Sequence, residues 1–310
     1  MSAVDRPRVG VIVHRAKNLG GGLEELRAVL ADYGHADPPW YEVDKSKFAS
    51  KKVSKLVEKD GIDRLLVWGG DGTLRRCVDT VLHEGYDDVA IACLPAGTAN
   101  LLALNLGIPV DVRAAVDIAL HGEVRPLDAG LVNDDEHFVV MAGAGFDAML
   151  IRDADDSGAK DRFGRLGYVM AGVRNRNMSP ARAEIHLDGD PWYTGDASCV
   201  IAGNVGRLIG GLPAFPDASP DDGRLDVGVV AARKSSDWAR LFGSVVAGRT
   251  ATSPFAQVAT AQKIVIELDR TLPWQADGGD RDRNNRFEIQ CLPAAVRFCR
   301  PRTETKEHTS

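Results

Sequence analysis

The chain has 310 residues and a formal net charge of −6, so it is long enough for two domains and carries no basic excess that would indicate nucleic-acid binding as its main role. Its five cysteines form no Cys-x-x-Cys pair, which favours reduced packing residues of a cytoplasmic protein over a disulfide framework or a zinc site. No apolar run approaches the length needed to span a bilayer, so any membrane contact is expected to be peripheral.

The first 128 residues alternate between short apolar runs and segments with helical spacing of apolar residues. The apolar runs, which are typical of buried strands, cover residues 9–13, 40–43, 65–68 and 89–94. Each is followed by a segment with helical periodicity, and Asp111 is suited to cap the helix expected at 112–120. This alternation predicts a doubly wound parallel α/β sheet, whose ligands bind beyond the carboxyl ends of the strands.

The pattern changes near residue 126, because most apolar stretches from residue 137 onward indicate strands with few helices between them. Strands are expected at 138–141, 183–187, 198–202, 225–230, 264–268, 287–291 and 295–298, and helices at 166–173 and 238–246. Such strands pair antiparallel, which predicts an antiparallel β-rich second domain. The predicted domains are residues 1–128 and 129–300, followed by a polar, disordered tail at 301–310.

Glycines between a strand and a helix form the first chemical motif, Gly69-Gly70-Asp71-Gly72-Thr73. There, backbone N–H groups can approach an anion and the helix N-terminus adds partial positive charge, which predicts a phosphate site. The motif is neither a Walker A loop nor a dinucleotide fingerprint. A carboxylate facing phosphates needs a cation between them, so Asp71 indicates Mg²⁺ or a water network around it. The competing interpretation is an Asp-Gly hairpin turn, but the residues that follow have helical spacing.

A second strand-turn-helix motif, Gly97-Thr98-Ala99-Asn100, follows one βα unit later. Adjacent parallel strands would place both turns on one edge of the sheet, where Thr98 and Asn100 could donate hydrogen bonds to the same nucleotide. Thr98 alone would more simply be a helix cap. The pairing of two such turns favours nucleotide binding.

With these motifs in view, the chain resembles the catalytic domain of diacylglycerol kinases and related bacterial lipid kinases, within a wider superfamily that includes NAD kinases. The motifs of that family occur here in family order: Gly69 to Thr73, Gly97-Thr98-Ala99-Asn100, Gly143-Ala144-Gly145-Phe146-Asp147, Asp222-Gly223-Arg224-Leu225-Asp226 and Asp277-Gly278. The resemblance implies ATP and Mg²⁺ bound in a cleft between the two domains, and phosphoryl transfer to a lipid hydroxyl.

The resemblance also implies roles for single residues. Gly69, Gly70, Asp71, Gly72, Thr73 and Thr98 match ATP-binding positions, and Asp71 matches the aspartate tied to the catalytic Mg²⁺. Asp128 matches an acidic residue of the same network. The structural metal loop of the family falls on Ser219, Asp222 and Arg224, with the first and last contributing backbone carbonyls. For this loop a type I turn without metal is the alternative.

The last motif departs from the family at its third position. In the family it ends in Glu, which the resemblance casts as the base that takes the proton of the acceptor, whereas position 279 here is Gly. Asp277 matches the motif and could serve as that base, and Asp280 could reach in if the turn is one residue longer. A loose phosphoryl-transfer transition state tolerates a weaker base.

The leading hypothesis is therefore an ATP- and Mg²⁺-dependent lipid kinase that acts on diacylglycerol or a similar lipid, in the cytoplasm or peripherally at the membrane. Two alternatives stay open: a catalytically impaired relative that binds nucleotide or lipid, as Gly279 suggests, and an NAD kinase. No spacing encodes the lipid acceptor, since an apolar cleft recognises acyl chains by its shape. The oligomeric state is also left open, with a homodimer as one option.

Overall fold

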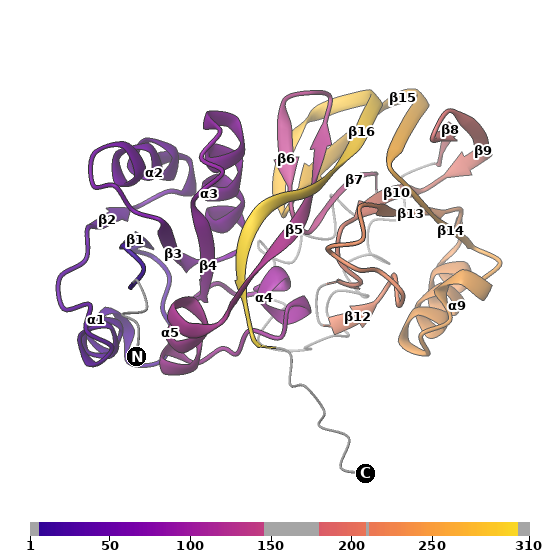
Figure 1. The fold of residues 1–310 in the computed structure, drawn as a ribbon. Helices are drawn as coiled ribbons and strands as arrows, with labels where there is room; N and C mark the ends of the chain where they lie inside the picture. The colour runs from indigo at the N-terminus through magenta and orange to yellow at the C-terminus, as the bar shows by residue number, and fades with distance from the viewer. Residues whose placement is uncertain (1–5, 146–179, 209–210, 303–310) are drawn as a thin grey trace, which may run out of the picture. The chain divides into compact units, whose positions relative to one another are not determined.

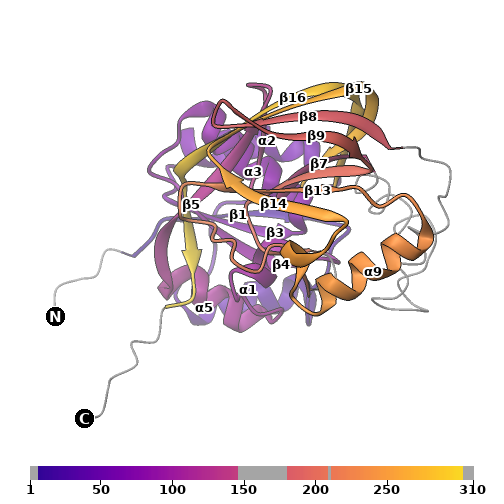
Figure 2. The same ribbon diagram turned by 90° about the vertical axis from the view of Figure 1, so that its right-hand side faces the viewer.

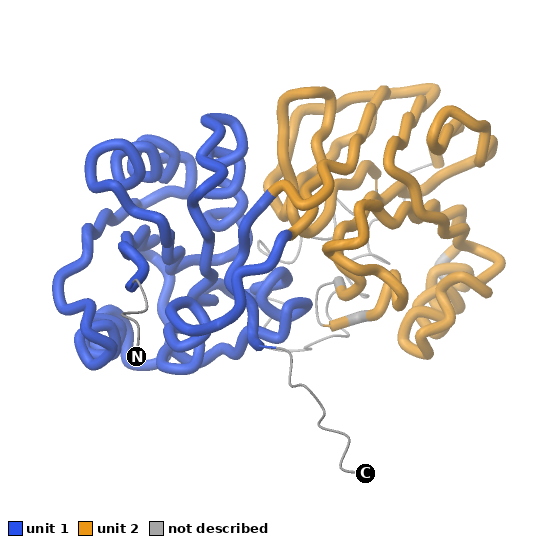
Figure 3. The backbone as a smooth tube through the Cα atoms, viewed as in Figure 1, with its two compact units in different colours: residues 1–126, 296–310 blue, residues 127–295 orange. Residues whose placement is uncertain are grey.

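The computed structural model describes residues 6–145, 180–208 and 211–302 (Figure 1). They form two compact units: residues 1–126 with 296–310 make up unit 1, and residues 127–295 make up unit 2 (Figure 3). The expected helix at 166–173, the Phe146-Asp147 pair and the tail beyond residue 302 lie outside the described residues.

Unit 1 alternates between strands and helices along most of its length. Its elements are β1 (Val9–His14), α1 (Gly22–Asp32), β2 (Trp40–Val43), the 3-10 turn η1 (Ser46–Phe48), α2 (Ala49–Glu58), β3 (Arg64–Gly69), α3 (Asp71–Glu84), β4 (Ala90–Pro95), α4 (Leu101–Asn105) and α5 (Val112–His121). The four strands predicted from apolar runs are therefore confirmed, each within a few residues of its predicted bounds.

The sheet of unit 1 is parallel, with the strand order β2-β1-β3-β4 and the end of β16 beside β4. Helices α2 and α3 contact each other, and α1 contacts α5, so the two pairs cover opposite faces of the sheet (Figure 1). This arrangement confirms the doubly wound fold. The strand order reverses between β1 and β3, and ligands of such sheets bind at the carboxyl ends of the strands near that point.

Burial explains why the strands of unit 1 read as continuous apolar runs. Every residue of β1 and β4 is buried, because helices cover both faces of the sheet. By contrast, α3 is apolar on one side only and ends at Gly85, whose φ of 68° lies in the left-handed region that closes helices.

Unit 2 consists mainly of strands. Its elements are β5 (Glu123–Val132, which begins in unit 1), β6 (Glu136–Phe138), β7 (Met141–Gly145), β8 (Ala181–Leu187), β9 (Asp190–Ala197), β10 (Cys199–Gly203), β11 (Arg207–Leu208), β12 (Leu212–Pro213), β13 (Leu225–Val230), α9 (Ser235–Val246), the 3-10 turn η3 (Thr250–Thr252), β14 (Ala256–Ala261), β15 (Lys263–Ala276) and β16 (Gly279–Arg300, which ends in unit 1).

The strands of unit 2 pair antiparallel in the order β14-β13-β10-β7-β15-β16, and β8 with β9 extends the sheet from β15 (Figure 2). Alternate side chains of β13 are buried, as in a strand with one face on a core. That core includes Phe138, Ile185, Leu225 and Phe287. The predicted antiparallel β-rich domain is confirmed.

The second unit differs from its prediction at the C-terminal end. Residues 287–291 and 295–298, expected as two strands, belong to one long strand, β16. Unit 2 ends at residue 295 and residues from Val296 onward belong to unit 1, whereas the second domain was predicted to extend to residue 300, and that boundary stays a prediction. The physical reason is that Arg297 and Phe298 pair with Ala90 and Ile91 of β4, which closes the edge of the parallel sheet.

All five cysteines are described, and each is free and buried, as expected of packing residues. Among the described residues, no helix is long and apolar enough to cross a membrane.

Candidate active site

The two glycine turns of unit 1 touch each other at the carboxyl ends of β3 and β4. The strands are in register there, with Gly69 opposite Pro95. A Cβ atom placed on Gly97 would lie 2.4 Å from Cα of Gly70, so no side chain fits at that point. The structure therefore brings the two predicted turns together, and glycine is required because backbone meets backbone.

The side chain of Asn100 holds the second turn closed. Its backbone has a φ of 47°, its Oδ1 accepts from the N–H of Gly97 at 2.9 Å, and its Nδ2 donates to the carbonyls of Pro95 and Gly97 at 3.1 and 2.9 Å. We expected this amide to bond a nucleotide, but the turn itself engages it. Thr98 is exposed on the same turn, so its hydroxyl is accessible to a ligand.

Asp71 lies at the first residue of α3 and points its carboxylate toward the start of α4. Its Oδ1 accepts from the N–H of Leu102 at 3.1 Å, which adds a link between the two turns. Burial raises the pKa of Asp71, and hydrogen bonds from backbone N–H groups at residues 100–102 oppose that rise. Removing this carboxylate from water disfavours its charged form, so a cation nearby would relieve the cost.

Ser46, which sequence analysis missed, belongs to the same edge of the sheet. Its hydroxyl lies 2.9 Å from Oγ1 of the buried Thr73, so η1 after β2 supplies a polar group to the glycine turn. The end of β3 is also fixed to the loop after β1, because Trp68 Nε1 donates to the carbonyl of Lys17 at 3.1 Å. The signal that could have revealed Ser46 is its position just past the carboxyl end of a predicted strand.

In unit 2, Asp128 organises the predicted metal loop. Its Oδ2 accepts from the N–H of Gly223 at 2.6 Å and its Oδ1 from the N–H of Ala294 at 2.7 Å. Its own N–H donates to the carbonyl of Pro220 at 2.8 Å. Asp128 is 2% exposed. These contacts give Asp128 a clear structural role in unit 2, whereas its predicted catalytic role stays a prediction.

The predicted metal loop at 219–224 is a tight, oxygen-rich turn. Asp222 Oδ1 accepts from the N–H of Arg224 at 2.9 Å, and the guanidinium of Arg224 donates away from the loop, to Thr260 and Asp188. Within Arg224, the backbone carbonyl is therefore the group that can serve as a metal ligand.

Acidic side chains surround this loop. Burial and the negative charges of Asp222 and Asp217 raise the pKa of Asp226 to about 6. Oxygen donors with excess negative charge suit a hard cation such as Mg²⁺. No cluster of three or more His, Cys, Asp or Glu side chains able to hold a metal occurs among the described residues, so a metal here would depend on backbone carbonyls.

Asp277 anchors the turn between β15 and β16. Its carboxylate accepts from three buried backbone N–H groups, those of Val139, Val140 and Met141, at 2.8 to 2.9 Å. Its own N–H donates to the carbonyl of Met141 at 2.9 Å. Asp277 is 4% exposed and has a φ of 45°. The carboxylate thus holds the turn against the start of β7 and the two residues before it, whereas its predicted role in proton transfer stays a prediction.

Gly279 lies beside an arginine. A Cβ atom on Gly279 would be 2.8 Å from Nη1 of Arg281, and that guanidinium forms a mostly buried ion pair with Glu136. The position where the family carries a carboxylate therefore faces positive charge in this chain. Asp280, the other predicted substitute, is exposed.

Two family models match nearly the whole chain. The model described as diacylglycerol kinase catalytic domain matches residues 8–132. The model described as YegS C-terminal NAD kinase beta sandwich-like domain matches residues 140–300. The division between the two matches falls close to the division between units 1 and 2.

Individual relatives agree with these matches. A protein of Klebsiella pneumoniae (strain 342) named "Probable lipid kinase YegS-like" is 29% identical over 282 residues, which is 90% of each chain. The "Lipid kinase YegS" of Escherichia coli (strain K12) is 27% identical over 285 residues, again 90% of each. The crystal structure of a diacylglycerol kinase from Bacillus anthracis str. Sterne has a TM-score of 0.75 at 24% identity, covering 96% of this chain and 98% of that one. This last likeness concerns the fold.

Proposed function

Because this chain belongs to the bacterial lipid kinase family, which joins a diacylglycerol kinase catalytic domain to a YegS C-terminal NAD kinase beta sandwich-like domain, we propose that it is an ATP- and Mg²⁺-dependent lipid kinase. It would transfer the γ-phosphate of ATP to the hydroxyl of diacylglycerol or a related lipid. The observation that carries the proposal is the contact between Gly70 and Gly97, which builds one backbone surface from two turns.

The nucleotide phosphates would lie against these two turns. The first turn of α3 presents the positive end of a 14-residue helix to them, and Gly72 leaves the backbone open to the ligand. The exposed hydroxyl of Thr98 and the hydroxyl pair of Ser46 and Thr73 supply further hydrogen bonds at this edge. Asn100 contributes indirectly, since it keeps the second turn in the required shape.

Asp71 and the loop at 219–224 are the residues that would hold Mg²⁺. At Asp71 a bound Mg²⁺ would neutralise charge on the transferring phosphoryl group. The half-buried carboxylate of Asp71 suits that position, because its pKa is raised by desolvation and a cation would favour its charged form. At the loop, Asp222 would bind through its carboxylate, and Ser219 and Arg224 through their carbonyls.

The acceptor side is where this chain departs from its family. Asp277 is occupied by three backbone N–H groups, and Gly279 has no side chain to accept a proton. We propose that Asp277 positions the turn and that turnover is slow because no carboxylate replaces the family Glu. Gly279 also favours the second candidate function, a nucleotide- and lipid-binding relative with impaired catalysis.

One assay separates these proposals. Purified protein with Mg²⁺-ATP is given a panel of diacylglycerol, sphingoid and glycerolipid acceptors and, in a separate reaction, NAD, and labelled products are identified. Turnover that is lost in Asp71→Asn supports the kinase. Turnover on NAD alone would instead identify an NAD kinase. Nucleotide binding without turnover on any acceptor supports the impaired relative, and absence of both binding and turnover overturns the two proposals together.

The variant Gly279→Glu tests the departure directly. It places a carboxylate at the family position, beside the guanidinium of Arg281, which has to move because the added Cβ would lie 2.8 Å from Nη1. If the missing base limits the rate, lipid turnover should rise by about 100-fold, the low end of general-base effects. The matched control is Gly279→Gln, which has the same size and no base. An equal effect of both substitutions would contradict the reasoning.

A further inference from the structure

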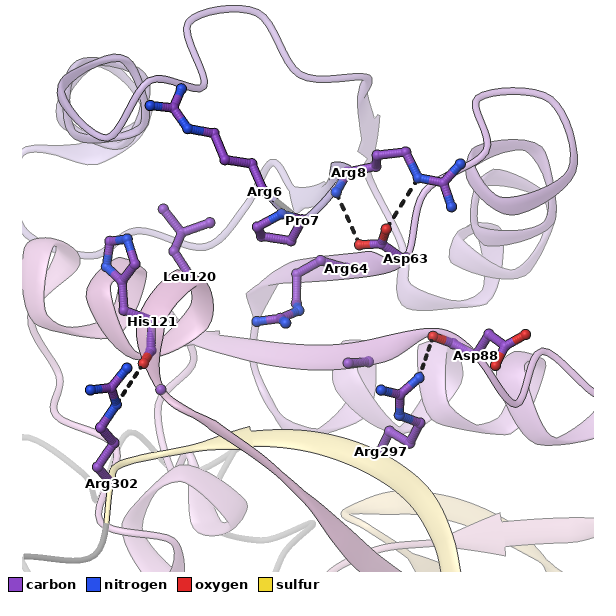
Figure 4. Close-up of a pocket in the computed structure, with 12 residues that line it drawn as sticks. Arg6, Pro7, Arg8, Asp63, Arg64, Asp88, Leu120, His121, Arg297 and Arg302 are labelled. Carbon is purple, nitrogen blue, oxygen red and sulfur yellow. Dashed lines mark hydrogen bonds and ion pairs between the residues drawn. The ribbon is translucent and has the colours of Figure 1, made fainter. Parts of the chain in front are cut away.

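An arginine-lined cavity lies at the amino-terminal edge of the unit 1 sheet. It has a volume of about 650 Å³ and is lined by residues just before β1, at the starts of β3 and β4, at the end of α5, and in and just after the last part of β16 (Figure 4). The glycine turns occupy the opposite edge, at the end of the six-residue strand β3. The two places are therefore separated by about one strand length, roughly 17–20 Å.

The cavity concentrates positive charge in a chain that is acidic overall. Five of its lining residues are arginines and two are aspartates, Asp63 and Asp88, whereas the whole chain has a formal net charge of −6. One arginine is neutralised, because Arg8 forms an ion pair with Asp63 at 3.1 Å. Arg6 turns its guanidinium toward Gly34, away from the others (Figure 4).

The three remaining arginines are held by neutral groups. Arg297 Nη1 donates to the carbonyl of Asp88 at 2.8 Å, and Arg302 Nε donates to the carbonyl of His121 at 2.9 Å. Arg64 Nη1 donates to the carbonyl of Ala119. Carbonyl oxygens orient a guanidinium without cancelling its charge. No ion pair compensates these three arginines within the described part of the chain.

The same three side chains keep donors available. A guanidinium carries five N–H donors, and the contacts above use one on each. Arg64 Nε is buried and has no acceptor among the described residues. A phosphate group matches the planar fork of arginine and accepts two parallel hydrogen bonds from it. The volume of the cavity also falls in the range of small-molecule sites.

We propose that this cavity, defined by Arg64, Arg297 and Arg302, binds a phosphate group at a site separate from the glycine turns. The ligand is either a small free phosphate, such as inorganic phosphate or pyrophosphate, or the monoester phosphate of a lipid headgroup. Both sources present the same terminal phosphate oxygens to the guanidinium groups. The proposal does not depend on the lipid kinase reaction.

The test uses the full chain with Arg297→Gln and Arg302→Gln combined, because both side chains are exposed and the double variant should fold. Titration calorimetry with phosphate and pyrophosphate measures the free ligands. Sedimentation with phosphatidylcholine vesicles, with and without phosphatidic acid, measures the lipid source. The matched control is Arg113→Gln, an exposed arginine of unit 1 whose partner is Asp32, outside the cavity.

We expect the wild type to bind in at least one arm and the double variant to bind at least about ten-fold more weakly, since charge-assisted hydrogen bonds are lost. Arg113→Gln should bind like the wild type. Gly97→Ala should also retain this binding, because the cavity lies at the other edge of the sheet. The proposal is overturned if the wild type binds in neither arm, if the double variant binds as tightly as the wild type, or if only Gly97→Ala loses binding.

Discussion

Replacing Asp277 is expected to loosen unit 2 before it affects any chemistry. Its carboxylate is the acceptor for three buried backbone N–H groups, and leaving a buried donor without its partner costs about 1–3 kcal/mol. Asp277→Ala removes the acceptor of all three hydrogen bonds. It also places alanine at a φ of 45°, in the left-handed region that alanine rarely adopts. We expect a loss of roughly 3–6 kcal/mol, because the three contributions are not fully additive.

Asp277→Asn should be milder. Asparagine tolerates the left-handed region and keeps one oxygen, which can still accept from Val140 and Met141. The hydrogen bond from the N–H of Val139 is lost, so about 1–3 kcal/mol is expected. For a unit of this size, each kcal/mol lowers the melting temperature by about 2–4 °C.

Amide hydrogen exchange measures the loosening of the backbone at the three N–H groups that Asp277 accepts from. Exchange at residues 139–141 should accelerate in the order wild type, Asp277→Asn, Asp277→Ala, while lipid turnover per folded molecule falls much less. The control is Asp280→Asn, an exposed carboxylate three residues away that should change neither exchange nor stability. If Asp277→Asn exchanges like the wild type but has lost all turnover, Asp277 acts on the acceptor proton and the structural reasoning is wrong.

Three further predictions concern unit 1. Asp71→Asn should keep its link to α4, since an amide oxygen can accept the same hydrogen bond, but lower Mg²⁺-dependent turnover by about 100-fold or more; unchanged kinetics would leave Asp71 a structural role only. Gly97→Ala should weaken ATP binding in calorimetry and cost about 1–3 kcal/mol of stability, because its Cβ would lie 2.4 Å from Cα of Gly70. The control is Gly243→Ala, which has open space around the added Cβ and should be neutral or stabilising. Burial and a neighbouring lysine lower the pKa of His14, so stability should fall as pH drops below about 6.5, and His14→Asn should flatten that decline in pH-dependent melting curves; parallel curves would contradict the assignment.

The first half of the fold follows from local signals in the sequence. Apolar runs of four to six residues, each followed by helical spacing, indicate strands covered on both faces, and every residue of β1 and β4 is buried. The two glycine turns, at Gly69 and at Gly97, were also predictable, because glycines between a strand and a helix are typical of a phosphate site. Among the strands missed in the second half, β9 contains several polar residues and β14 is half alanine, and both are exposed or half-buried over most of their length, so no strong apolar pattern marks them.

The tasks of the site residues could not be predicted in the same way. From the sequence alone, the carboxylate of Asp277 and the amide of Asn100 were suited to binding a ligand. In the fold, both form hydrogen bonds with the backbone. Ser46 entered the site because the carboxyl end of β2 shares an edge with β3. A side chain of either kind can bond a ligand or the backbone, and only the position of the neighbouring main chain decides between them.

The glycine turns and their order along the chain were thus determined by the sequence itself, since backbone freedom and hydrophobic periodicity are local properties. The arginine cavity was decided by the tertiary structure alone. Arg64, Arg297 and Arg302 line one cavity because β16 returns to pair with β4 at Ala90, far from it in sequence. Such an arrangement depends on long-range pairing, and no spacing of residues within one segment records it.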